Sequence, residues 1–221
     1  MAVLLMFAGG GWLAAQSESE SGSADGSPSP AMAPGNIDVG IGGGLGGLIY
    51  PHLEPQVDVG VLNTESITLS AGGLVDAGYC VFCGILGAIS DDWKVRSWYV
   101  GAYGRALVHL NSLGAQLGDG ARLDPFVGVH AGPQLYRFRL VYEPDDTSSS
   151  YTETTVGIVP TLGARLFFNE EIRWFGFGEM RYLIEFGFQD STVDINGATY
   201  TVDETVSRRG FDLTLGIGTR L

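Results

Sequence analysis

The chain has 221 residues, a net charge of −13 and only 17% charged residues. This acidity excludes nucleic acid as a partner, because a nucleic-acid backbone requires a basic surface. The apolar content excludes a disordered chain, and the length suits one domain, for which we expect no cofactor or metal.

The first segment predicts export. Residues 1–15, MAVLLMFAGGGWLAA, form an apolar block that ends in small residues and is too short to span a membrane as a helix. We interpret it as a signal peptide cut near Ala15. It contains no Lys or Arg, so either the start is misassigned or the signal is atypical. Residues 16–35, rich in Ser, Pro and Gly, predict a flexible leader.

The clearest predicted strand is 172–188, in which apolar and aromatic residues alternate with charged ones. Its period of two indicates a β-strand, and it exceeds the roughly 9–11 residues with which a tilted strand crosses a membrane. The same alternation predicts strands at 95–110, 155–168 and 211–221.

In one further predicted strand, 123–141, the same face is apolar in its first part and charged in its second part. Val127 and Val129 share a face with Arg137 and Arg139. Either a β-bulge or emergence of the strand from the membrane explains this change.

The first half of the chain alternates less clearly. Segments 37–49, 57–70 and 73–86 complete a set of eight predicted strands, which becomes ten if 57–62 and 66–70 are separate. The apolar run 71–89 has a second interpretation, a helix, although its glycines and its Val, Tyr and Phe residues favour strand.

The connections predict a barrel with unequal ends. Segments 142–153 and 189–207 are polar and acidic loops, and the tight connection Asn169-Glu170-Glu171 lies between them. Long loops that alternate with short turns are typical of outer-membrane barrels. Asn196-Gly197 predicts a type I′ hairpin, which we expect to extend the last two strands above the membrane.

These patterns predict an all-β fold, a single up-and-down antiparallel transmembrane barrel spanning 36–221. Segments 123–140 (LDPFVGVHAGPQLYRFRL), 172–188 and 211–221 resemble strands of the OmpA/OmpX-like outer-membrane β-barrel superfamily. The resemblance implies a bacterial outer-membrane location and recognition of the last strand by the barrel-assembly machinery. Many members end in an aromatic residue, whereas this chain ends in Leu221.

The polar phase of the strands holds charges of both signs. An eight-stranded barrel leaves room only for side chains, so opposite charges inside it must pair. We therefore predict a closed lumen rather than a channel. The predicted lumen charge network is Arg105, Arg165, Glu179, Arg181, Glu185, Asp212 and Arg220.

The other phase holds aromatic residues, which we expect to face lipid. A soluble lipocalin-like barrel would instead point them inwards. The predicted lipid-facing aromatics are Trp98, Trp174, Tyr182, Phe186, Phe188 and Phe211.

Two short motifs have both a chemical and a structural interpretation. Gly42, Gly44 and Gly47 match G-x-G-x-x-G, but no helix follows, so a curved strand is the better interpretation. Cys80 and Cys83 lack a second pair for zinc, and a local disulfide and two unpaired cysteines are equally compatible with the sequence.

The histidines are His52, His109 and His130. His130 has no serine nearby on its strand face, and Ser97 lies far along the predicted strand from His109. We interpret them as lumen-filling and expect no enzyme; an outer-membrane lipid A deacylase or acyltransferase and a small passive channel are the alternatives. The expected role is structural or surface-interacting. Expected partners are outer-membrane lipids, lipopolysaccharide and an unidentified ligand of loops 142–153 and 189–207.

Overall fold

The computed structural model describes residues 32–46, 50–89, 92–117, 121–145, 147–168, 173–187, 191–202 and 207–221. The predicted signal peptide, most of the predicted leader and Phe188 lie outside these residues.

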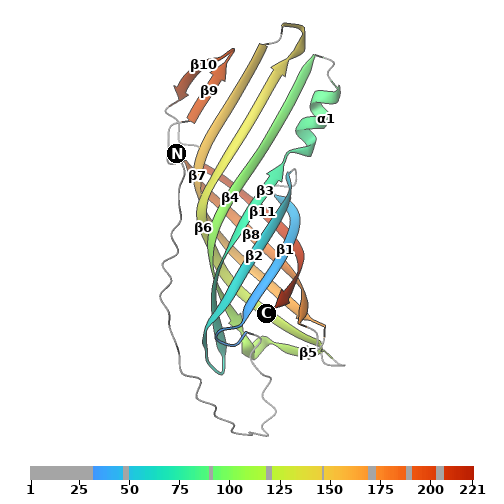
Figure 1. The fold of residues 1–221 in the computed structure, drawn as a ribbon, viewed down its shortest axis with the longest axis vertical. Helices are drawn as coiled ribbons and strands as arrows, with labels where there is room; N and C mark the ends of the chain where they lie inside the picture. The colour runs from blue at the N-terminus through green and yellow to red at the C-terminus, as the bar shows by residue number, and fades with distance from the viewer. Residues whose placement is uncertain are drawn as a thin grey trace.

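Eight antiparallel strands form a closed barrel (Figure 1). Each pairs with the strand before it, and the last pairs with the first, as Asp38 opposite Arg220 shows. The predicted fold class is confirmed, with eight strands rather than ten. The strands are β1 (Ile37–Gly46), β2 (Tyr50–Asn63), β3 (Ile67–Tyr79), β4 (Trp93–Leu110), β6 (Ala121–Tyr142), β7 (Thr147–Phe167), β8 (Trp174–Gly187) and β11 (Ser207–Arg220).

The prediction of one strand over 57–70 was wrong. The chain turns after Asn63, and β2 instead begins at Tyr50 and passes through Pro51 and Pro55. Both prolines lie on the exposed face, and the pairing with β3 is interrupted between Leu53 and Gln56. The missing donor of Pro55 is therefore tolerated, because the ladder is open at that point.

The strand predicted over 73–86 was also wrong beyond Tyr79. A short helix, α1 (Val81–Ile89), follows β3, and it begins beside a disulfide between Cys80 and Cys83. The disulfide forms because the segment leaves the strand at Cys80. Within the described residues, no helix is long and apolar enough to cross a membrane.

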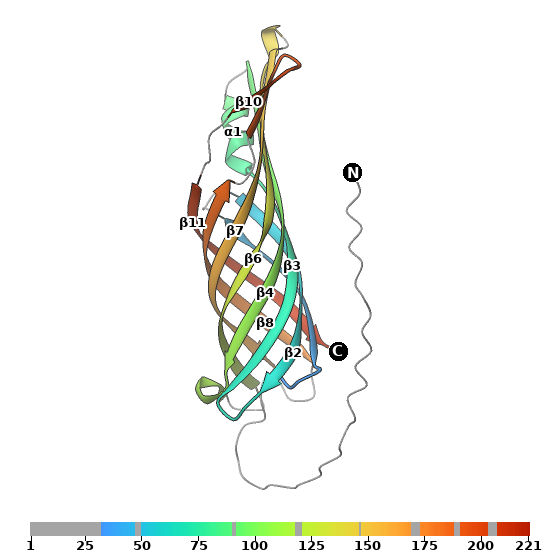
Figure 2. The ribbon, with the colours of Figure 1, turned by 90° about the vertical axis from the view of Figure 1, so that its left-hand side faces the viewer.

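The two ends of the barrel differ (Figure 2). Asn36 and Leu221 lie at the end that carries the short turn 64–66, the connection 168–173 and the longer connection that contains β5 (Ala115–Leu117). The opposite end carries α1 and the long extension of β6 and β7. Short turns are typical of the periplasmic side and long connections of the outside, so we name the ends periplasmic and outer.

The predicted loop 142–153 is mostly strand. Only Glu143–Asp145, in a 3-10 turn, and residue 146 separate β6 from β7, which pair without a break from Tyr142 and Thr147 to Arg122 and Phe167. There is no bulge, so emergence from the membrane is what explains Arg137 and Arg139, both on the outward-facing side of the strand. The pairing of Arg139 with Ser150 through Tyr142 with Thr147 continues this hairpin above the membrane.

The predicted hairpin at Asn196-Gly197 is confirmed, and both residues have positive φ angles. It joins β9 (Ser191–Ile195) to β10 (Ala198–Val202). However, β9 pairs with β7, between Ser149 and Thr152, so the hairpin does not extend the last two strands. The reason is that β7 continues beyond its last pair with β8, Thr155 with Gly187, and leaves an edge for β9.

The outward face of the barrel is an apolar belt. Its exposed side chains include Val100, Val129, Ile158, Met180, Leu213, Leu215 and Ile217. The inward face holds charged side chains and a cluster of Phe167, Phe175 and Phe177. A Cβ on Gly216 would lie 2.3 Å from the Phe177 ring, so the lumen-facing glycines of β1 and β11 make room for these rings.

The periplasmic mouth is covered by the residues before β1. Met32 is fully buried, with its Sδ 3.5 Å from Nη1 of Arg165, and Gly35 donates to the carbonyl of Gly60. The end of the predicted leader, residues 32–35, therefore packs on the barrel rather than hanging free.

Candidate functional site

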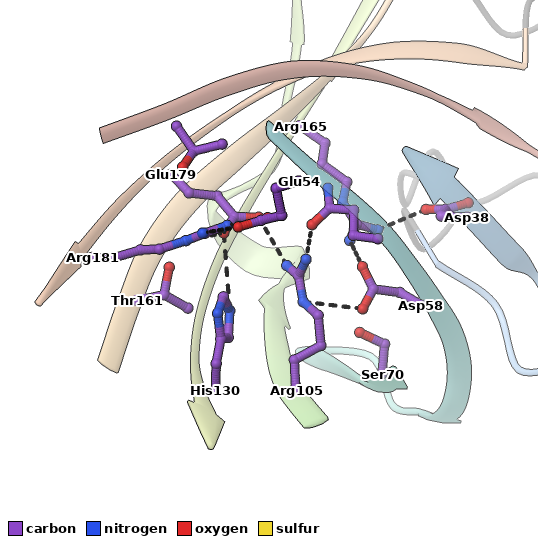
Figure 3. A network of polar contacts seen from close by, with 12 residues as sticks. Asp38, Glu54, Asp58, Ser70, Arg105, His130, Thr161, Arg165, Glu179 and Arg181 are labelled. Carbon is purple, nitrogen blue, oxygen red and sulfur yellow. Dashed lines mark hydrogen bonds and ion pairs between the residues drawn. The ribbon is translucent and has the colours of Figure 1, made fainter. Parts of the chain in front are cut away.

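The periplasmic half of the lumen is held by two arginines that contact two aspartates (Figure 3). Arg165 donates to Asp38 at 2.7 Å and also to Asp58. Nε of Arg105 lies 3.2 Å from Asp58. The ring faces of Phe126 and Phe175 lie 5.5 and 5.3 Å from the Arg165 guanidinium carbon, so this cation is held by both carboxylates and aromatic faces.

The network continues towards the middle of the barrel through Glu179. This carboxylate accepts from Arg105 at 2.8 Å and from Nε of Arg181 at 2.9 Å. Arg181 also forms a two-pronged contact with Glu54. Because these side chains are buried and cross-linked across opposite walls, they close the lumen instead of lining an open pore.

The structure brings five of the seven predicted network residues into connected ion pairs: Arg105, Arg165, Glu179, Arg181 and Arg220. Arg220 binds Asp38 near the periplasmic mouth. The remaining two lie nearer the outer end. Glu185 accepts a hydrogen bond from Thr155 at 3.4 Å, and Asp212 lies 3.7 Å from Nε2 of His52.

Sequence reasoning missed the acidic partners in the first half of the chain. Asp38, Glu54 and Asp58 supply most of the negative charge of the network. For Glu54 and Asp58, the signal was the even positions His52, Glu54, Gln56 and Asp58, which alternate with apolar residues but were hidden by Pro51 before them and Pro55 among them.

A Ser–His–Asp arrangement was also missed. Nε2 of His109 lies 3.0 Å from Ser70 Oγ, and its Nδ1 lies 2.8 Å from Asp124. These distances match those of serine hydrolases. However, all three side chains are buried, with Ser70 only 3% exposed, and none of them lines the outer cavity described next. The arrangement satisfies the hydrogen bonds of a buried histidine.

The outer half of the lumen is hollow. A cavity of about 190 Å³ extends from the level of His130 and Arg181 to Gly46 and Phe211, near the outer ends of β1 and β11. Its wall includes Asp76, Tyr99, Tyr103, Glu185 and Asp212. The cavity is thus lined by carboxylates and aromatic rings, in contrast to the filled periplasmic half.

The predicted lipid-facing aromatics lie on the outward face wherever the structure describes them. Trp174, Phe186 and Phe211 are exposed, and Trp98 and Tyr182 are half-buried. The rings of Tyr182 and Phe211 contact each other, with centroids 4.9 Å apart. This orientation contradicts the lipocalin-like alternative, in which the rings would point inwards.

An apolar outer face around a polar interior closed by ion pairs, with long strand extensions at one end, is typical of a membrane barrel. The chain has the fold of a small outer-membrane β-barrel. A major outer-membrane protein of Thermus thermophilus is similar in structure, with a TM-score of 0.55 and 14% identity over 84% of this chain and 99% of that chain.

The attachment invasion locus protein Ail of Yersinia pestis also matches, with a TM-score of 0.45 and 11% identity over 85% of this chain and 99% of that chain. No family model and no curated protein matches the sequence. The chain therefore shares its fold, and little of its sequence, with the Thermus thermophilus protein.

Proposed function

We propose that this outer-membrane barrel is a non-enzymatic anchor that presents a protruding β-sheet to other proteins outside the cell. The observation behind the proposal is the sheet formed above the barrel by β4, β6, β7, β9 and β10. From Tyr136 to Tyr142, β6 adds seven residues, or roughly 23 Å of strand, beyond Leu135 at the top of the apolar belt.

One free edge of this sheet is β10, which ends the strand order and has no further neighbour among the described strands. Ile195 and Ala198 flank the two-residue turn and form its hydrogen-bonded pair. Because successive N–H groups of a strand point to opposite sides, those of Thr199 and Thr201 point away from β9, towards the free edge. An exposed edge of this kind can accept a strand from another protein.

The interior supports an anchor rather than a channel. The ion pairs of Arg105, Arg165 and Arg181 cross the lumen, and Met32 covers its periplasmic mouth. The same packing leaves the Ser70–His109–Asp124 arrangement no room for a lipid substrate, which favours a structural role over a hydrolase.

The test removes one outward N–H group of β10. Cells that display the wild-type barrel should attach to surfaces coated with extracellular proteins, and Thr201→Pro should abolish most of that attachment because proline has no donor. Thr201→Val keeps the N–H group and serves as the matched control. Equal attachment by the Pro variant and the wild type, with equal amounts of folded barrel, would overturn the proposal.

A further inference from the structure

Two carboxylates oppose each other inside the outer half of the lumen. The β2–β3 register, Leu53 with Ala77 and Gln56 with Leu74, places Glu54 opposite Asp76. Both side chains are buried. Like charges directly across a strand pair repel, and burial strengthens the repulsion, so this pair requires positive charge nearby.

Only one of the two carboxylates forms an ion pair among the described residues. Glu54 binds Arg181, whereas Asp76 forms no ion pair and is contacted by the neutral hydroxyl of Tyr99 at 3.3 Å from both oxygens. Asp76 is 8% exposed. A buried carboxylate with so weak a partner is costly, and a bound cation would remove that cost.

His52 adds a nitrogen ligand on the same strand face, two residues before Glu54. Its Nε2 lies 3.0 Å from Thr214 Oγ1 and 3.7 Å from Asp212, while its buried Nδ1 has no hydrogen-bond partner in the part of the chain that the structure describes. A histidine whose one nitrogen is oriented by a hydroxyl and a carboxylate, and whose other nitrogen is free, has the typical arrangement of a metal ligand.

These three residues converge. Potential ligand atoms of His52, Glu54 and Asp76 lie within 4.8 Å of one another, and bonds of roughly 2.0–2.2 Å to a central ion require only a modest inward movement. Asp76 also lines the outer cavity, which gives a hydrated ion a route from outside. We propose that His52, Glu54 and Asp76 bind a first-row divalent cation, with Zn²⁺ as the best match, inside the barrel.

The metal type follows from the donors. One imidazole with carboxylates suits Zn²⁺ and its neighbours in the transition series, whereas Ca²⁺ and Mg²⁺ favour sites made only of oxygen. Arg181 does not depend on Glu54 alone, because its Nε and Nη2 also donate to Glu179 at 2.9 and 2.6 Å, so Glu54 can turn one oxygen to the ion.

The experiment titrates Zn²⁺ into the full chain, without a polyhistidine tag, folded in detergent and treated with chelator beforehand. Isothermal calorimetry should detect one Zn²⁺ per barrel. Asp76→Asn and His52→Gln should abolish binding, and Thr214→Val should weaken it about tenfold, because Thr214 only orients the imidazole. Zinc X-ray absorption should show one imidazole and oxygen ligands without sulfur.

The matched control is Asp124→Asn, which alters a buried carboxylate paired with a histidine at the periplasmic end. This variant should bind Zn²⁺ as the wild type does. Asp76→Asn removes charge but little volume, so it should fold, which heat-modifiable gel mobility can verify. Absence of Zn²⁺ binding by the wild type, unchanged binding by folded Asp76→Asn, or displacement of Zn²⁺ by equal Mg²⁺ would each overturn the proposal.

Discussion

The two halves of the lumen are built from the same alternating strands but differ in packing and charge. In the periplasmic half, Asp38 and Asp58 each contact arginine, and aromatic rings fill the remaining space. In the outer half, Asp76 has no ion pair among the described residues and borders a cavity of about 190 Å³. We therefore expect the filled half to supply most of the stability, and the hollow half contains the proposed metal site.

The largest expected effect comes from removing the central cation of the filled half. Arg165→Met leaves Asp38 and Asp58 buried with one arginine fewer and should cost about 3–5 kcal/mol of unfolding free energy. Urea unfolding of the barrel in detergent, followed by tryptophan fluorescence, measures this loss.

Two further variants serve as controls for Arg165→Met. Adding Asp58→Asn to Arg165→Met should restore part of the lost stability, because it removes an uncompensated carboxylate. Arg139→Met, on the outward face of β6, should have little effect. A loss for Arg139→Met as large as for Arg165→Met would show that the lumen network does not determine stability.

A smaller effect is expected where the network meets the hollow half. Arg181→Met removes charged hydrogen bonds to Glu54 and Glu179, but Arg181 lines the cavity, so its loss lets water from the cavity reach these buried carboxylates. We therefore expect a loss of about 1.5–3 kcal/mol in the same urea experiment. If Arg181→Met destabilised the barrel more than Arg165→Met, the proposed contrast between the halves would be wrong.

The smallest effect concerns the Ser70–His109–Asp124 arrangement. Ser70→Ala leaves Nε2 of His109 without its partner and should cost about 1 kcal/mol. Because the serine is buried, the folded wild-type protein should not react with a fluorophosphonate probe. Labelling that disappears in Ser70→Ala would instead identify a serine hydrolase and contradict the non-enzymatic function.

Much of the fold could be predicted from local alternation. In β4, β8 and β11, apolar and polar residues alternate without proline, so both the strand and its two faces were predicted from sequence. In the first half, the strand prediction failed at Pro51 and Pro55, because these prolines conceal the alternation of β2. The helix α1 was predicted as strand, because an apolar run with glycines has no period that separates helix from strand.

By itself, the sequence determined which side chains face the lumen, because side chains alternate between the two faces of a strand whatever its neighbours. It did not determine which of them meet. The pairing of Arg165 with Asp38 and Asp58, the convergence of His52, Glu54 and Asp76, and the attachment of β9 to β7 depend on strand tilt and register around the closed barrel. Those quantities belong to the whole ring of strands and not to any one segment, so only the tertiary structure decided them.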